Sequence, residues 1–191
     1  PILINEHYTR EYHKKYFQKL CDSLCNYTEK CTVSFVDLYK NTERNTKSLN
    51  IHTPSNEEVL ELMSFFSKIA HENGIYIDTC TEEYDLSSLN IKHACCIDKS
   101  RLERIGNYQL KIGKDKNQRS ICGCIESIDI GMYNTCENGC MYCYANFNCE
   151  MAQKNHNKHN PLSPLISGEI EYDDKLNIRN VKSNINNQLQ F

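Results

Sequence analysis

One stretch of the chain, residues 53–80, decides the fold class, and it reads TPSNEEVLELMSFFSKIAHENGIYIDTC. Residues 53–58 predict the start of a helix, because they contain a capping residue followed by Glu57 and Glu58. Acids in the first turn stabilise the positive end of the helix dipole. Gly74 is a usual stop signal, so we expect a helix that ends near residue 73. Residues 75–80 then form a short run typical of a buried strand. The stretch therefore predicts a helix followed directly by a strand.

The same alternation extends to both sides of this unit. Residues 8–28 carry apolar and aromatic side chains at helical spacing, residues 31–39 resemble a buried strand, and residues 40–50 are polar enough for a loop. A short helix is expected over residues 98–105. Strands separated by helices pair in parallel through right-handed crossovers. The predicted fold class is therefore α/β, either a partial (β/α) barrel-like parallel sheet or an open doubly wound sheet.

Length, net charge and composition limit the classes of protein to which the chain can belong. The chain has 191 residues, enough for one domain with a hydrophobic core, and its net charge of −3 does not indicate a nucleic-acid partner. It has no apolar run long enough to span a membrane. No signal peptide is recognisable, and the opening Pro1-Ile2-Leu3-Ile4, which is similar to the end of a buried strand, predicts a piece of a longer protein. We expect a cytoplasmic location.

Twelve cysteines crowd toward one end of the chain, which favours a reduced, metal-binding protein over a disulfide-stapled one. The densest group is Cys136-x3-Cys140-x2-Cys143, with Cys122-x-Cys124 upstream. Gly139 lies inside this group and permits backbone conformations that other residues resist. We expect an α/β scaffold over residues 1–113, a cysteine-rich iron–sulfur segment over 114–168 and a poorly ordered tail over 169–191.

The spacing of the cysteines distinguishes between the kinds of metal site that they could form. Structural zinc sites favour two pairs of the form Cys-x2-4-Cys, and bacterial ferredoxins use a different four-cysteine run. Cysteines at x3 and then x2, with an aromatic residue before the third, are typical of radical S-adenosylmethionine enzymes. Three thiolates hold a [4Fe–4S] cluster there and leave one iron open for that cofactor. We therefore expect Cys136, Cys140 and Cys143 to bind such a cluster.

The chain resembles the DUF1848 family, bacterial proteins without an assigned function. The resemblance is carried by residues 114–119, the cysteine segment through Asn146, Phe35-Val36-Asp37-Leu38-Tyr39, His93 and Cys96-Ile97-Asp98. It covers nearly all of residues 1–168 and implies that this chain is the C-terminal two-thirds of a family member. It also implies a barrel-like α/β fold and a C-terminal cysteine cluster similar to that of radical S-adenosylmethionine enzymes. In those enzymes, however, the cluster loop follows the first strand and a glycine-rich turn holds the cofactor, and this sequence has neither feature.

Other residues carry weaker signals. Tyr142 is expected to flank the cofactor ring, and Arg119 to attract an anionic group of the cofactor or substrate. Cys122 and Cys124 have three alternatives: a fourth cluster ligand, a second metal, or small core side chains. Acids and polar residues just past strand ends either face the substrate or cap the next helix, namely Asp37, Asp78, Thr79, Glu82 and Glu83. Cys21, Cys25, Cys31 and Cys80 are expected in the core, Cys96 as a buried thiol, and His156 and His159 on a solvated face.

Three functions remain open from sequence. The first is a radical S-adenosylmethionine-like enzyme that acts on a small-molecule or macromolecular substrate and takes electrons from a reductant such as a ferredoxin or flavodoxin. The second is a closed [4Fe–4S] protein in electron transfer or redox sensing, in which Cys122 or Cys124 completes the ligand set. The third is a structural zinc module.

Overall fold

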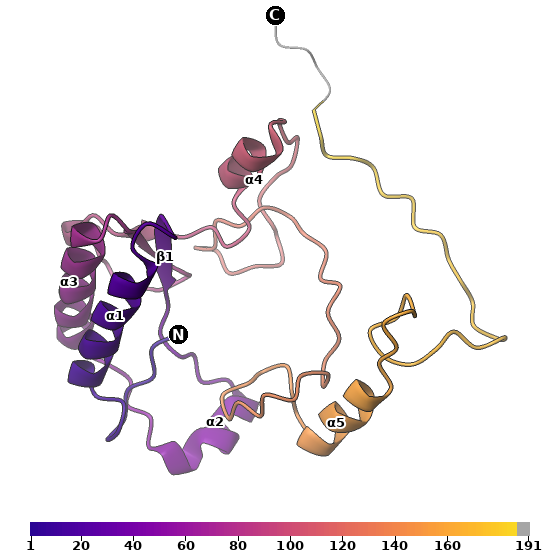
Figure 1. Ribbon diagram of the computed structural model, residues 1–191, viewed down its shortest axis with the longest axis horizontal. Helices are drawn as coiled ribbons and strands as arrows, with labels where there is room; N and C mark the ends of the chain where they lie inside the picture. The colour runs from indigo at the N-terminus through magenta and orange to yellow at the C-terminus, as the bar shows by residue number, and fades with distance from the viewer. Residues whose placement is uncertain (187–191) are drawn as a thin grey trace, which may run out of the picture. The chain divides into compact units, whose positions relative to one another are not determined.

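The computed structural model describes residues 1–186 and has an α/β fold (Figure 1). Three strands form a parallel sheet in the order β1-β2-β3: β1 (Lys30–Val33), β2 (Tyr76–Thr79) and β3 (Lys92–His93). Cys31 pairs with Ile77, and Thr79 pairs with His93. The predicted parallel pairing is confirmed. The sheet is partial and is not closed into a barrel, and the strand expected over residues 31–39 is shorter than predicted.

The two long helices follow the sequence signals. α1 (Arg10–Leu24) starts at Thr9, whose side chain accepts a hydrogen bond from the Tyr12 N–H. α3 (Asn56–Glu72) starts in a reciprocal capping box between Ser55 and Glu58. Gly74 follows α3 with a φ of +68°, a left-handed conformation that glycine adopts without a steric penalty. The shorter α4 (Lys99–Gly106) begins where it was predicted, after Asp98.

The polar segment 40–50 is helical, and its prediction as a loop is wrong. It forms α2 (Lys40–Thr46) and a 3-10 turn, η1 (Lys47–Leu49). The Thr42 hydroxyl accepts a hydrogen bond from the Tyr39 N–H at 2.7 Å, and the Thr46 hydroxyl donates to the Thr42 carbonyl at 2.7 Å. Both threonines are buried, so α2 depends on hydroxyl hydrogen bonds and not on an apolar stripe. Two further elements are η2 (Ser87–Leu89) and α5 (Cys149–Asn157).

A single apolar core joins the sheet to α1 and α3, which pack against each other (Figure 1). The rings of Phe17 and Phe66 stack with their centroids 4.0 Å apart. The central residues come from α3 and are almost completely buried: Val59, Leu62, Met63 and Phe66. Cys21 belongs to this core, as predicted, and Cys31 packs against it. The core fixes the strands whose carboxyl ends carry several of the remaining cysteines.

The chain divides into two compact units. The first contains residues 1–36 and 49–127 together with 184–186, and the second contains residues 37–48 and 128–183. Residue 185 pairs with Leu110 in an isolated antiparallel bridge of the first unit. Residues 187–191, the end of the predicted tail, lie outside the described residues. Over residues 1–186, no helix combines the length and the apolar character needed to span a membrane.

Candidate metal-binding cysteines

The second unit contains the loop with the three predicted ligands. Cys136 and Cys140 are exposed, Cys143 is half-buried, and all three are free thiols. The Cys143 N–H donates to the Cys140 carbonyl at 3.0 Å, which closes a tight turn between the second and third cysteines. Gly139 has a φ of +64°, and no other atom lies within 4 Å of the position of a β-carbon. The glycine therefore serves the turn through its left-handed backbone, as predicted.

Asn134 closes the base of this loop. Its backbone N–H donates to the Ala145 carbonyl at 2.9 Å, so the ends of the cysteine segment are joined. Its buried side-chain oxygen accepts hydrogen bonds from the N–H groups of Phe147 (2.7 Å) and Asn148 (3.3 Å). A φ of +54° is tolerated because asparagine adopts the left-handed region more readily than most residues. Asn134 thus holds the three cysteines within one closed loop.

Helix α5 is bonded to the same loop. The Asn155 side chain donates to the Asn134 carbonyl at 2.9 Å, and the His156 Nε2 atom lies 3.1 Å from a Glu137 carboxylate oxygen. The His159 ring instead bonds the Ile166 carbonyl, so the two histidines take different partners. Cys149 is the exposed first residue of α5. The loop therefore has a second support, and a fourth cysteine lies in the same unit.

The two predicted cofactor-binding residues fall in different units. Tyr142 lies in the turn between Cys140 and Cys143, with 41% of its surface exposed. Arg119 is exposed in the first unit, and its carbonyl accepts a hydrogen bond from the Cys122 N–H at 3.0 Å. Among residues 1–186, no group of three or more histidine, cysteine, aspartate or glutamate side chains is arranged so that it could hold a metal ion.

Other cysteines meet in the first unit, at the carboxyl end of the sheet. The sulfur atoms of Cys80 and Cys96 lie 3.3 Å apart. Cys80 follows β2 and Cys96 follows β3, and the parallel register brings the two strand ends together. Cys124 lies near enough to Cys96 and Cys122 for each of these thiols to shift its pKa. We call these four residues, Cys80, Cys96, Cys122 and Cys124, the strand-end thiols.

A hairpin delivers Cys122 and Cys124 to this group. Lys114 pairs with Ile125 in an antiparallel bridge, and the Asp115 N–H donates to the Cys124 carbonyl at 3.0 Å. On its other side the hairpin contacts the segment after β3, where the Ile97 N–H donates to the Cys124 sulfur at 3.3 Å. Both cysteines are buried, at 5% and 7% exposure. They are therefore held by backbone on two sides.

The surroundings stabilise different protonation states within this group. Burial alone would raise the pKa of Cys124, but hydrogen bonds from the Ile97 N–H, the Cys122 thiol and Cys96 outweigh it, and the pKa is lowered. Loss of hydration, followed by the hydrogen bond with Cys80, raises the pKa of Cys96 to about 12. The pKa values of these two thiols are therefore shifted in opposite directions.

Two of the acids near the strand ends, Asp78 and Glu82, bond to neighbouring segments of the first unit. Asp78 is buried, lies 2.6 Å from the Lys30 ammonium and accepts a hydrogen bond from the Thr32 hydroxyl at 2.7 Å. Glu82 accepts from the Phe35 N–H at 2.7 Å, and Thr79 is buried. Asp37 and Glu83 are exposed. Asp78 and Glu82 therefore hold neighbouring segments together.

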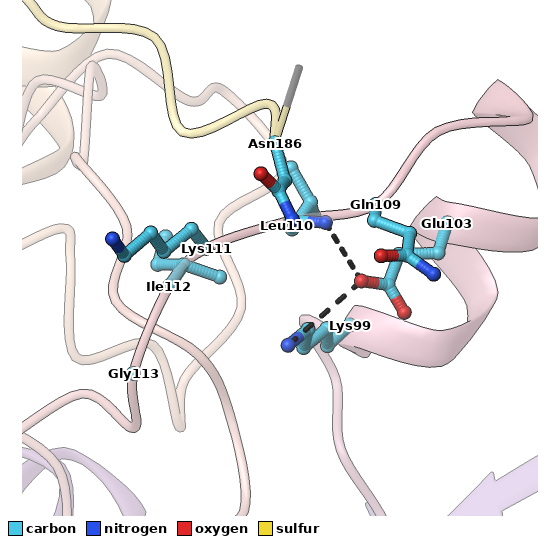
Figure 2. A pocket seen from close by; sticks show the side chains of 8 residues that line it. All are labelled: Lys99, Glu103, Gln109, Leu110, Lys111, Ile112, Gly113 and Asn186. Carbon is cyan, nitrogen blue, oxygen red and sulfur yellow. Dashed lines mark hydrogen bonds and ion pairs between the residues drawn. The ribbon is translucent and has the colours of Figure 1, made fainter. Parts of the chain in front are cut away.

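A surface pocket of the first unit lies away from the cysteines (Figure 2). Its lining comes from α4 and the segment after it, with residue 186. The Glu103 carboxylate in its wall accepts from the Leu110 N–H at 2.7 Å and lies 3.8 Å from the Lys99 ammonium. No cysteine lines this pocket. Its carboxylate is engaged in joining α4 to the next segment, so we do not assign it a ligand.

Two contributions escaped the sequence reasoning. Asn134 precedes the first loop cysteine by two residues, and the only signal was its tolerance of turn conformations. Cys80 was expected in the core and Cys96 as a buried thiol, whereas Cys80 is half-buried, Cys96 is exposed and their sulfurs are in contact. That contact follows from strand pairing, which local patterns do not reveal.

Comparison with known proteins gives one match. The model of a family described as "Domain of unknown function (DUF1848)" matches residues 1–145. No curated protein and no solved structure matches the chain. The matched region covers the sheet, the strand-end thiols and all three loop cysteines. The chain therefore belongs to the DUF1848 family.

Proposed function

We propose that Cys136, Cys140 and Cys143 bind a [4Fe–4S] cluster and that the protein is a radical S-adenosylmethionine-like enzyme. The observation that carries the proposal is the closed loop based on Asn134. It presents three free thiols within eight residues, and two of them are exposed. An exposed thiolate can take up inorganic iron and sulfide without unfolding of a core. The spacing then leaves one iron without a protein ligand.

The donor set fits such a cluster. Thiolates are the usual ligands of iron–sulfur clusters, and the loop supplies three of them from a short segment. A loop whose ends are already joined loses less conformational entropy when the metal orders it. The hydrogen bonds of Asn134 and Asn155 orient the backbone that carries the cysteines, in the way that outer partners orient metal ligands.

The chemistry would divide between cofactor and chain. When bound, a reduced cluster of this kind supplies the electron that cleaves a carbon–sulfur bond of S-adenosylmethionine, and a ferredoxin or flavodoxin would replace that electron. Tyr142, which is partly exposed, would stack on the cofactor. Arg119 belongs to the other unit, where it would attract an anionic group of the substrate. The substrate is a small molecule or a macromolecule.

A second candidate, a closed cluster without catalysis, is favoured by the position of Cys149. This exposed cysteine begins α5, and the N–H of the preceding Asn148 bonds the Asn134 side chain. A fourth thiolate from Cys149 would remove the open iron. The protein would then serve electron transfer or redox sensing.

Electron paramagnetic resonance separates the two functions. Anaerobically reconstituted and reduced protein should give a cluster signal that changes when S-adenosylmethionine is added. The Cys149→Ser variant should keep both the cluster and the change. An unchanged signal in the wild type, together with loss of the cluster in Cys149→Ser, would contradict the radical enzyme and support the closed cluster.

A further inference from the structure

We propose that Cys80 and Cys96 form a reversible disulfide, a redox-sensitive modification site at the carboxyl end of the sheet in the first unit. Their sulfur atoms lie 3.3 Å apart, although the two residues are 16 positions apart in sequence. Cys80 follows β2 and Cys96 follows β3. A disulfide has a sulfur–sulfur bond of about 2.05 Å, so oxidation needs an approach of about 1.2 Å, a movement within the reach of side-chain rotation.

The backbone of Cys80 is held by its neighbours on both sides. The Cys80 N–H donates to the Val33 carbonyl at 3.1 Å, which joins it to the end of β1. The carbonyl of the preceding Thr79 accepts from the Ala94 N–H at 2.6 Å, which joins it to the segment after β3. Thr79 and Ala94 are both buried. The position of Cys80 is therefore fixed by the packed sheet.

The segment that carries Cys96 is held by the hairpin. The Ile97 N–H donates to the Cys124 sulfur at 3.3 Å, and the Ile97 carbonyl accepts from the Ile125 N–H at 3.2 Å. Two thiols on anchored backbones have a high effective concentration toward each other, because little chain entropy remains to be lost when they react. The pair is therefore preorganised for a bond between its sulfurs.

Access to reagents favours the same pair. Cys96 is exposed and Cys80 is half-buried, whereas both cysteines of the hairpin are buried. Cys95 is the sequence neighbour of Cys96, but a β-carbon on Gly123 would lie 2.6 Å from its sulfur. The Cys95 sulfur therefore packs against the hairpin backbone. We expect oxidation to select Cys80 as the partner of Cys96.

The oxidant is a small disulfide such as oxidised glutathione, and the reaction is thiol–disulfide exchange. One thiolate of the pair attacks a glutathione sulfur, which forms a mixed disulfide and releases one glutathione thiolate. The second protein thiolate attacks the protein sulfur of the mixed disulfide and releases the other glutathione. Two protein sulfurs are thus oxidised, the glutathione disulfide is reduced, and the two thiol protons pass to the released glutathione thiolates. Excess reduced glutathione drives the same steps backward.

The disulfide would join the segments after β2 and β3 covalently. Ligands of α/β sheets bind outside the carboxyl ends of the strands, so the bond would form at the end of the sheet where binding is expected. A cross-link that closes a loop of about this length lowers the equilibrium constant for unfolding about a hundredfold. Oxidation would therefore make this end of the sheet more stable, and reduction would release it.

The test uses the full chain with Cys136→Ser, Cys140→Ser and Cys143→Ser, so no outcome depends on the proposed cluster. The reduced native protein is equilibrated with oxidised glutathione, free thiols are blocked, and the tryptic peptides are analysed by mass spectrometry. Trypsin separates residues 69–92, which contain Cys80, from residues 93–99, which contain Cys96. We expect the joined pair of these peptides to be the main cross-link. Reduced glutathione should remove it, and in concentrated urea the preference for this pair should vanish.

Cys95→Ser is the matched control, because Cys95 lies in the same peptide as Cys96. This variant should keep the cross-link in equal yield. Cys80→Ser should lose it and leave Cys96 as a mixed disulfide with glutathione. A native protein without the cross-link, a bond from Cys96 to Cys124 instead, or equal yields in native and urea-unfolded protein would overturn the proposal. The parent protein alone decides the test if Cys80→Ser fails to fold.

Discussion

Two regions of this molecule gather cysteines in opposite ways. The loop of the second unit draws its cysteines from one short segment, keeps two of them exposed and relies on asparagine hydrogen bonds for its shape. The strand-end thiols come from three segments far apart in sequence, and two of them are buried. The comparison shows that a motif within one short segment is recognisable from the spacing of its residues. A group of residues that strand pairing brings together is recognisable only in the folded structure.

The largest expected effect is a difference in thiol reactivity between the exposed loop cysteines and the buried Cys21. Burial raises the pKa of Cys21 to about 11, so about one molecule in a thousand carries the thiolate there at pH 8. Cys136 and Cys140 are exposed. In reduced, metal-free protein we expect iodoacetamide to alkylate the two loop cysteines at least about a hundredfold faster than Cys21, as followed by peptide mass spectrometry. Equal rates would mean that the core around Cys21 opens readily.

Removing the Asn134 side chain should damage one region and spare the other. Asn134→Ala leaves the N–H groups of Phe147 and Asn148 without their acceptor, at a cost of about 3 kcal/mol to the second unit. The reconstituted iron content should fall, while the stability of the first unit should stay constant. Metal analysis and chemical denaturation check both.

Asn160→Ala is the matched control for that change. Asn160 lies in the same unit, and its side chain has two exposed partners: it donates to the Glu169 carboxylate and accepts from the Leu162 N–H. Its loss should change stability by less than about 0.5 kcal/mol and leave the iron content intact. An Asn134→Ala variant that behaves like Asn160→Ala would show that the base of the loop does not govern the cluster.

One ion pair, between Lys30 and Asp78, joins the neighbouring strands β1 and β2 and stabilises the first unit. Lys30→Met leaves the buried Asp78 carboxylate without its cation and should cost about 2 kcal/mol at pH 7 in urea unfolding. The hydrogen bond to Asp78 raises the pKa of Lys30. The contribution of the pair is therefore fully present below the ordinary lysine pKa near 10.4 and is lost as the pH rises through the higher folded value.

The difference between Lys30→Met and wild type should accordingly shrink only in strongly alkaline solution. Lys68→Met is the control, since Lys68 is exposed and 4.0 Å from Glu72. That change should cost less than about 0.5 kcal/mol. If the two variants lost equal stability at pH 7, the ion pair would not be the cause.

The smallest expected effect is at the strained turn. Thr81 has a φ of +51°, and asparagine adopts positive φ more easily than threonine, so Thr81→Asn should stabilise the protein by roughly 1 kcal/mol. Thermal unfolding measures this. A loss of stability would indicate that the Thr81 hydroxyl, 3.9 Å from the Cys80 sulfur, contributes more than the strain costs.

Sequence alone predicted the elements with strong local signals. α3 and β2 followed from a cap, an apolar stripe and Gly74, and the parallel sheet followed from the alternation of elements. α2 was missed because its stability comes from buried threonine hydroxyls, which leave no periodic apolar pattern. The left-handed turn at Gly139 was foreseen for a similar local reason.

The strand-end thiols could not be predicted in the same way. Cys80 and Cys96 meet because Thr79 pairs with His93, and that register depends on which strands become neighbours. Cys122 and Cys124 had three alternatives from spacing, and the structure buries both of them in the hairpin. The contact between Cys80 and Cys96 was therefore unpredictable because it depends on long-range strand pairing and not on residue type.

The most direct test of the account is the iron and sulfide content after anaerobic reconstitution, compared between wild type and Cys140→Ser. The account predicts about four irons and four sulfides per chain in the wild type, with a brown visible spectrum, and near loss of both in the variant. A colourless wild type, or equal iron in the two proteins, would contradict a cluster on the loop cysteines.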